Sequence, residues 1–112
     1  MSTLQIPQNR NTTISIQIEN GDEPYHLENG DKVVFGVKKH YNNNYYLIYS
    51  ETTEEQGDTG VYTINLTAEE TNIPNLYAFY DVAIIQQDGT ILTVIPCTEC
   101  VICPSIVKGE EE

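Results

Sequence analysis

The three cysteines of the chain lie in one short run, C-T-E-C-V-I-C, in which Cys97, Cys100 and Cys103 are separated by two residues each. Thiolates at this spacing are typical ligands of zinc or of an iron–sulfur cluster, but such sites need a fourth ligand and a loop on which the sulfurs converge. An extended segment instead directs Cys100 to the face opposite the other two, and His26 and His40 lie far away along the chain. We therefore expect structural or incidental thiols and no cofactor, with a metal site as the alternative that a zinc assay tests.

Residues for covalent or acid–base catalysis are not arranged in a known pattern. The sequence has no G-x-S-x-G motif and no glycine-rich phosphate loop. Its paired glutamates, Glu54 with Glu55 and Glu69 with Glu70, are neighbours along the chain, whereas a glycosidase needs two carboxylates facing each other across a cleft. We expect no enzymatic activity and no catalytic residues.

Tyrosines are concentrated around the turn of residues 42–44, which consists of three asparagines. Tyr41, Tyr45, Tyr46 and Tyr49 flank this turn. Exposed tyrosine and asparagine are typical of contact surfaces, because tyrosine supplies area at a low entropic cost and asparagine supplies adaptable hydrogen bonds. These four tyrosines form the candidate interaction surface; the alternative is that half of the rings pack on the core.

The charge balance limits the partners that such a surface can bind. The chain has 112 residues, of which 17 are acidic and 5 are Lys or Arg, giving a net charge of −12. This field repels phosphate backbones and anionic lipids, so we expect binding to neither nucleic acid nor membranes. Acids gather in residues 51–58 and 110–112, and Lys32, Lys38 and Lys39 on one segment. We predict a partner with a basic surface and an association that weakens with salt.

The expected location of the protein depends on whether the sequence contains a membrane-spanning segment or a secretion signal. Its longest apolar stretches are far shorter than the roughly 20 residues that span a bilayer. Residues 1–10 have no charged region followed by an apolar one, so we expect no secretion signal. We expect a chain made and kept in the cytosol unless it is carried out as part of something larger.

Short alternating segments rich in Val, Ile, Thr and Tyr predict an all-β fold. The expected strands cover residues 12–19, 32–39, 45–50, 61–66, 77–86 and 90–95, followed by short pieces at 100–103 and 105–107. Gly36 predicts a bulge or a close neighbouring backbone, and Pro96 is expected to end its strand. The segment 77–86 is apolar on both parities, which predicts a central strand covered on both faces.

The connections between these strands carry recognisable turn signals. Residues 51–60 are polar and predict a solvated loop, and Asp88-Gly89 predicts a two-residue hairpin. Thr67 to Glu70 matches a capping box and predicts one helical turn before Pro74. We predict one domain over 1–108, a small antiparallel β-sandwich (immunoglobulin-like or Greek-key) of about seven strands, and a disordered acidic tail over 109–112.

The order of these segments resembles the N-terminal β-domain of phage baseplate upper and tail structural proteins, many of them prophage-encoded in Gram-positive gut bacteria. The resemblance is carried by I-S-I-Q-I, L-E-N-G-D-K-V-V-F-G-V-K-K, G-V-Y-T-I-N-L-T-A-E-E-T and L-Y-A-F-Y-D-V-A-I-I-Q-Q-D-G-T-I-L-T-V-I-P. It spans residues 12–107, and its most specific part is 66–71 followed by 77–82.

The resemblance implies a virion component of the phage tail, made in the bacterial cytoplasm, that acts by protein–protein assembly. Its partners would be other tail and baseplate proteins, including further copies of itself as trimers or hexamers. The alternative from a different class is an immunoglobulin-like module that binds carbohydrate or a receptor, since residues 67–80 echo the turn and tyrosine that precede strand F of such domains.

Overall fold

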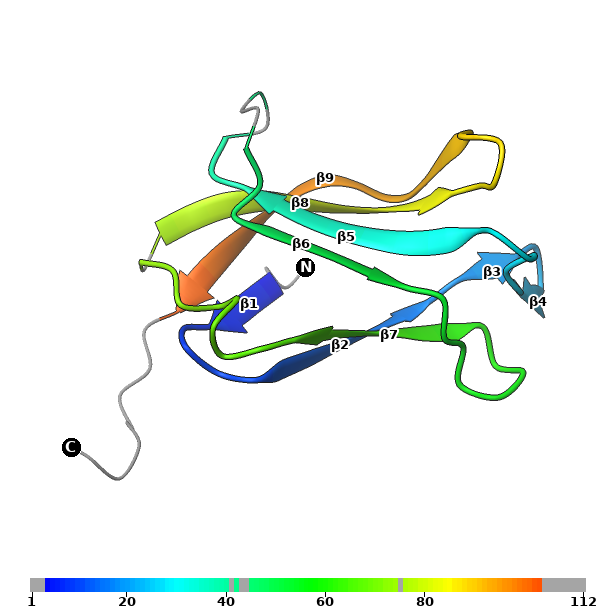
Figure 1. The fold of residues 1–112 in the computed structure, drawn as a ribbon, viewed down its shortest axis with the longest axis horizontal. Coiled ribbons are helices and arrows are strands. Elements are labelled where there is room, and N and C mark those ends of the chain that lie inside the picture. Colours follow the sequence, from blue (N-terminus) through cyan, green and yellow to red (C-terminus); the bar gives the residue numbers. More distant parts are fainter. Residues whose placement is uncertain (1–3, 41, 43–44, 75, 104–112) are drawn as a thin grey trace.

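The computed structural model describes residues 4–40, 42, 45–74 and 76–103, which form strands and turns but no helix (Figure 1). The all-β prediction is therefore confirmed. The strands are β1 (Leu4–Pro7), β2 (Thr12–Gln17), β3 (Glu19–Asn20), β4 (Glu23–Pro24), β5 (Lys32–Lys38), β6 (Ile48–Thr52), β7 (Val61–Leu66), β8 (Leu76–Ile85) and β9 (Ile91–Cys103).

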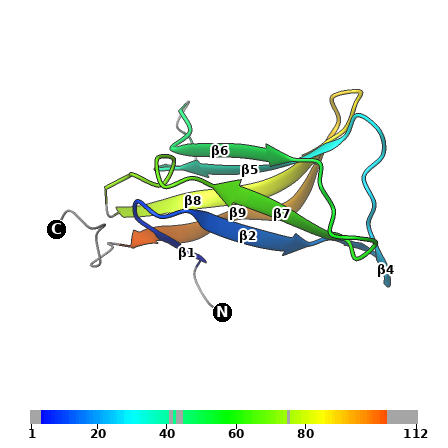
Figure 2. The ribbon, with the colours of Figure 1, turned by 60° about the horizontal axis from the view of Figure 1, so that its bottom comes forward.

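The strands form two layers. One is a five-stranded sheet of order β1-β9-β8-β5-β6; the other is the antiparallel pair β2–β7, extended by the small hairpin β3–β4. Figures 1 and 2 show the β2–β7 pair lying across one face of the five-stranded sheet. Not every pairing is antiparallel as expected, because β1 runs parallel to the end of β9.

The core lies between these two layers and follows the alternation in the sequence. Every second residue of β5 and of β7 points inward, because side chains of a strand alternate between its faces. The buried apolar residues that pack together in this core are Ile6, Ile16, Ile18, Val33, Phe35, Val37, Ile48, Tyr62, Ile64, Leu66, Ile73, Ala78, Val82, Ile84, Cys100 and Ile102. The hydroxyl of buried Tyr62 donates to the carbonyl of Tyr25 (2.6 Å) and accepts from the N–H of Leu27 (3.0 Å), so burial leaves it bonded.

Strand β9 differs from its prediction at Pro96. It continues through this residue to Cys103, and its register with β8 shifts on either side of Val82. A bulge absorbs the irregularity, and proline is tolerated because that part of β9 is paired with β8 alone among the described strands. The expected separate piece at 100–103 is thus the end of β9, while residues 105–107 and 109–112 lie outside the described part of the chain.

Strand β6 begins later and ends later than the sequence predicts. Tyr45 and Tyr46 precede it, whereas Glu51 and Thr52, expected in a loop, belong to it. Glu55, also expected in that loop, forms a bridge to Tyr62 of β7. Residues 53–60 therefore connect the two layers and stay in backbone contact with β7.

The predicted turns form their hydrogen bonds, and only the hairpin loop differs in length from its prediction. The capping box is present, since the N–H of Glu70 bonds to Thr67 Oγ1 (3.1 Å) and the N–H of Thr67 to Glu70 Oε1 (2.8 Å). Residues 68–71 form a turn, with one i→i+4 bond from the N–H of Thr71 to the carbonyl of Thr67 (3.1 Å), and no longer helix follows. The β8–β9 hairpin has a three-residue loop: the N–H of Gly89 bonds to the carbonyl of Gln86, and Gly89 has a φ of 93°. A type I turn followed by a left-handed glycine makes this loop.

Candidate interaction surface

The outer face of the five-stranded sheet lies opposite the β2–β7 layer, and no described strand covers it (Figure 1). The register brings its side chains into rows across neighbouring strands, because directly paired residues point to the same side. One row joins Tyr49 of β6, Gly36 of β5 and Asp81 of β8. The next joins Lys38, Phe79 and Glu99 of β5, β8 and β9.

The predicted tyrosines occupy one corner of this face. Tyr46 and Tyr49 are exposed, their ring centroids 4.9 Å apart and their planes at 59°, and Tyr45 is 83% exposed in the connection before β6. The structure thus brings Tyr46 and Tyr49 together and leaves Tyr45 in solvent. Tyr41 lies outside the described residues.

Gly36 makes room for one of these rings. A Cβ atom at Gly36 would stand 2.7 Å from Cε1 of Tyr46, so the ring lies where any other residue would place its side chain. The Nζ atom of Lys38 lies 4.7 Å from the centroid of the same ring, within cation–π range. The expectation of a bulge or a close backbone at Gly36 is wrong, since its pairing with Tyr49 and Asp81 is regular and a side chain fills the space.

Charged groups extend this corner along β5 and β6. Glu51 Oε2 accepts hydrogen bonds from Lys32 Nζ (2.8 Å) and from the Tyr49 hydroxyl (3.1 Å). The bond from Lys32 lowers the pKa of Glu51 and raises that of Lys32, while partial burial and the bond to Glu51 raise the pKa of Tyr49. The ring of Tyr49 is thereby held by a hydrogen bond at one end and by Tyr46 at its side.

A hollow of about 310 Å³ opens on this face between β5, β8 and β9. Its lining residues are Gly36, Lys38, Tyr46, Phe79, Tyr80, Asp81 and Cys97. The hollow combines a cation, a carboxylate, a thiol and aromatic rings, which can hold a side chain or a small polar ligand.

Strand β8 contributes the surface residues that sequence reasoning missed. Tyr77 is 80% exposed, Asp81 is exposed and Phe79 is half-buried, although this strand was expected to be covered on both faces. The expectation of a central strand is correct, but only its Ala78, Val82 and Ile84 side is covered. The signal was Asp81 itself: a carboxylate on an apolar strand needs either buried partners or an open face.

The cysteines divide between the two faces as their parity requires. Cys97 is exposed on the outer face, and Cys100 is buried in the core, where burial raises the pKa of its thiol to about 11. Cys103 is half-buried and none of the three forms a disulfide. Within the described ranges, no three His, Cys, Asp or Glu residues are placed to hold a metal ion.

The two histidines lie in different surroundings. His26 Nδ1 lies 2.7 Å from a carboxylate oxygen of Glu55, and this bond raises the pKa of His26 and lowers that of Glu55. His40 is exposed beyond the end of β5. Among the described residues, neither histidine forms part of a group with the cysteines that could hold a metal ion.

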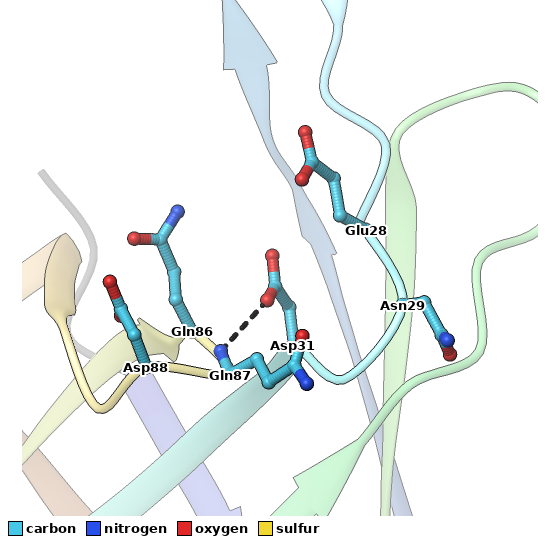
Figure 3. A pocket seen from close by; sticks show the side chains of 6 residues that line it. All are labelled: Glu28, Asn29, Asp31, Gln86, Gln87 and Asp88. Carbon is cyan, nitrogen blue, oxygen red and sulfur yellow. Dashed lines mark hydrogen bonds between the residues drawn. The ribbon is translucent and has the colours of Figure 1, made fainter.

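An acidic hollow of about 460 Å³ lies at the hairpin end of the sheet (Figure 3). Its carboxylates come from Glu28, Asp31 and Asp88. Asp31 is only 7% exposed, and its Oδ1 accepts a hydrogen bond from the backbone N–H of Gln87 (3.0 Å). Asp31 thus joins the turn before β5 to the β8–β9 hairpin, and its role is structural.

Comparison of the chain with protein-family models and with curated proteins gives no match. The described residues contain no helix long and apolar enough to cross a membrane.

Proposed function

We propose that this protein is a structural component of a phage or prophage tail or baseplate and acts by protein–protein assembly. The observation that carries the proposal is the uncovered outer face of the five-stranded sheet, to which two strands contribute exposed or half-buried aromatic residues, Tyr49 from β6 and Tyr77 and Phe79 from β8. Apolar and aromatic patches of this kind mark interaction sites on soluble domains, and tyrosine is enriched at interface centres.

The resemblance over residues 12–107 supports the same role. It supplies the class of partner, namely other tail and baseplate proteins together with further copies of the chain as trimers or hexamers. The virion is the place where such a protein acts, after its synthesis in the bacterial cytoplasm.

The charges on the face limit the form of the contact. Lys32 and Lys38 lie among Glu51, Asp81 and Glu99 on the outer face, while the chain as a whole carries −12. A partner that presents basic groups around an apolar centre matches this arrangement, and the association weakens as salt screens the outer charges.

A second candidate is an immunoglobulin-like module that binds carbohydrate or a receptor. The strand order β9-β8-β5-β6 with the separate pair β2–β7 corresponds to the order G-F-C-C′ and B–E of variable-type immunoglobulin domains. Within the outer face, the hollow with Tyr46, Lys38 and Asp81 offers a ring for stacking and charged groups for hydroxyls.

Co-purification tests the assembly role. The chain is expressed with the proteins encoded beside its gene, and Tyr77→Lys with Phe79→Lys is compared with Asn65→Lys, an exposed change on β7. We expect the double change to abolish co-elution with a neighbouring tail protein, and the control to retain it. Equal co-elution of both variants, or no partner among the neighbouring proteins, contradicts the proposal; glycan-array binding that depends on Tyr46 favours the second candidate.

A further inference from the structure

Strand β9 has one edge that is only partly used. Strand β8 pairs with it along its length, whereas β1 pairs on the other edge with Cys100–Cys103 alone, so that Figure 2 shows β1 beside the end of β9. Among the described residues, no strand pairs with residues 91–95 on that side. A stretch of strand thus has hydrogen-bonding groups without a neighbouring strand.

The hairpin fixes which of these groups face outward. The N–H of Gln86 bonds to the carbonyl of Thr90 (2.8 Å), which directs the backbone groups of Thr90 toward β8. Orientation alternates along an antiparallel pair, so Leu92 also bonds toward β8, while Ile91 and Thr93 direct their N–H and C=O to the open edge.

A groove runs beside this edge, between the two layers. It has a volume of about 540 Å³, and its apolar lining includes Leu92, which is 39% exposed, together with Val94, Ile18 and Tyr25. A strand added at Ile91 and Thr93 would turn every second side chain into this groove. Main-chain bonding and side-chain burial are therefore available at the same place.

Strand β1 already pairs with the same edge of β9 further along, in the way that an added strand would. It pairs with β9 at Cys100–Cys103, and its Ile6 is fully buried, opposite Ile102, in the core between the layers. An extended segment in line with β1 would continue this arrangement along residues 91–95.

The negative charge around the groove and on the whole chain favours a basic segment as the added strand. Glu19 is the one charged residue among those that line the groove, and the chain carries −12 in total. Residues 91–95 contain no lysine or proline, the residues that most often block an edge. A strand from a second copy of this chain would bring another −12 to this edge, so like charges disfavour a second copy as the occupant of this edge.

We propose that β9 accepts an extended segment of a partner protein as an additional strand beside β1, with apolar residues alternating with basic ones. This inference rests on the proposed assembly role but uses a different surface from the tyrosine-bearing outer face.

Amide hydrogen exchange, read residue by residue by NMR, tests the inference with a defined probe. The probe is a ten-residue peptide of alternating lysine and valine, and the matched control is the peptide of alternating glutamate and valine. We expect the basic peptide to slow exchange at Ile91 and Thr93 by about ten-fold or more, with Leu92 slow throughout because it bonds to β8. The acidic peptide is expected to cause no slowing.

Variants separate the edge from the face. Thr93→Pro removes one outward N–H and is expected to weaken peptide binding about five-fold, the loss of one hydrogen bond, whereas Thr93→Val retains binding. Tyr77→Lys leaves peptide binding unchanged and tests the outer face instead, so that the two proposals fail separately.

Three results would overturn the inference. One is the absence of slowing at Ile91 and Thr93 with the basic peptide. Another is slow exchange there in the isolated protein at every concentration, which means that the chain covers its own edge. The third is slowing that rises with protein concentration without peptide, which identifies a second copy as the occupant.

Discussion

The two faces of the five-stranded sheet are built from the same strands but have different surroundings. On β8, Ala78, Val82 and Ile84 pack against the β2–β7 layer, while Tyr77 and Asp81 of the other parity face solvent. Two strands are enough to cover the inner face and none of the described strands covers the outer one. The comparison shows that a strand with apolar residues on both parities can bury one of its faces in the core and leave the other exposed to solvent.

The largest expected effect is on the inner face. Phe35→Ala empties a fully buried site in the core and is expected to lower the free energy of unfolding by about 3–5 kcal/mol. Tyr77→Ala, on the outer face, is expected to change it by less than about 0.5 kcal/mol. Urea denaturation followed by circular dichroism measures both, and similar losses for the two variants would show that the outer face is also a core.

The rates at which Cys97 and Cys100 are alkylated compare the accessibility of the two faces. Burial raises the pKa of Cys100 to about 11, so only about a thousandth of this thiol is ionised at pH 8, and the thiolate is the reactive form. We expect iodoacetamide to alkylate exposed Cys97 first and to alkylate Cys100 more than about a hundred-fold more slowly than after unfolding in urea. Tandem mass spectrometry locates the label; equally fast alkylation of Cys100 in the folded protein would mean that the inner face opens.

Gly36→Ala tests how tightly the outer face is arranged. The new methyl group would displace the ring of Tyr46 from its place beside Lys38, and we expect a loss of stability of about 1 kcal/mol. The control is the same change in a Tyr46→Ala background, where the space is empty and the loss should vanish. An unchanged ring environment of Tyr46 by NMR in the single variant would contradict this packing.

The smallest expected effect concerns the ion pair on the outer face. The pKa of Glu51 is lowered by Lys32, so the contribution of this pair is complete above the ordinary carboxyl pKa and is lost as the pH falls through the lowered value. Both side chains are partly exposed, so the contribution is small and screened by salt. Lys32→Gln should differ from the natural chain at pH 7 but not at pH 2, in urea denaturation; the matched change at exposed Lys39 should differ at neither.

The alternation of apolar and polar residues predicted most strands, because a strand with one face in the core and one in solvent needs that alternation. Residues 12–17 and 61–66 alternate, and their buried parity is the one that the sequence indicates. On β5, Val33, Phe35 and Val37 form the core parity as predicted, although Val34 and Gly36 of the other parity are also buried. Strand β1 was missed because four residues ending in Pro7 give too short a pattern, and its parallel pairing depends on a contact almost a hundred residues away. After the capping box, the chain makes one i→i+4 hydrogen bond, from the N–H of Thr71 to the carbonyl of Thr67 (3.1 Å), because a capping box fixes hydrogen bonds at one end without supplying a helix to follow.

The candidate surface was predictable only in part. The tyrosine cluster around β6 could be named from residue types, but the neighbours Tyr77, Phe79 and Asp81 come from β8 and reach the same face through strand register. Register depends on the pairing of distant strands, and the residues of a single strand do not encode it. Gly36 correctly indicated that another group lies close to the strand. That group is the side chain of Tyr46, from the connection before β6, and not a backbone.

The parallel pairing of β1 with β9 has a mechanical consequence. Chain enters β1 at Leu4, opposite Cys100, and leaves β9 at Cys103, opposite Pro7. Tension applied to the chain on both sides of these strands pulls them past each other along their length, so the interstrand hydrogen bonds are loaded together in shear and do not open one at a time. If neighbouring proteins in a larger assembly pulled on the chain from both sides, the paired strands β1 and β9 would carry the force and resist extension of the domain.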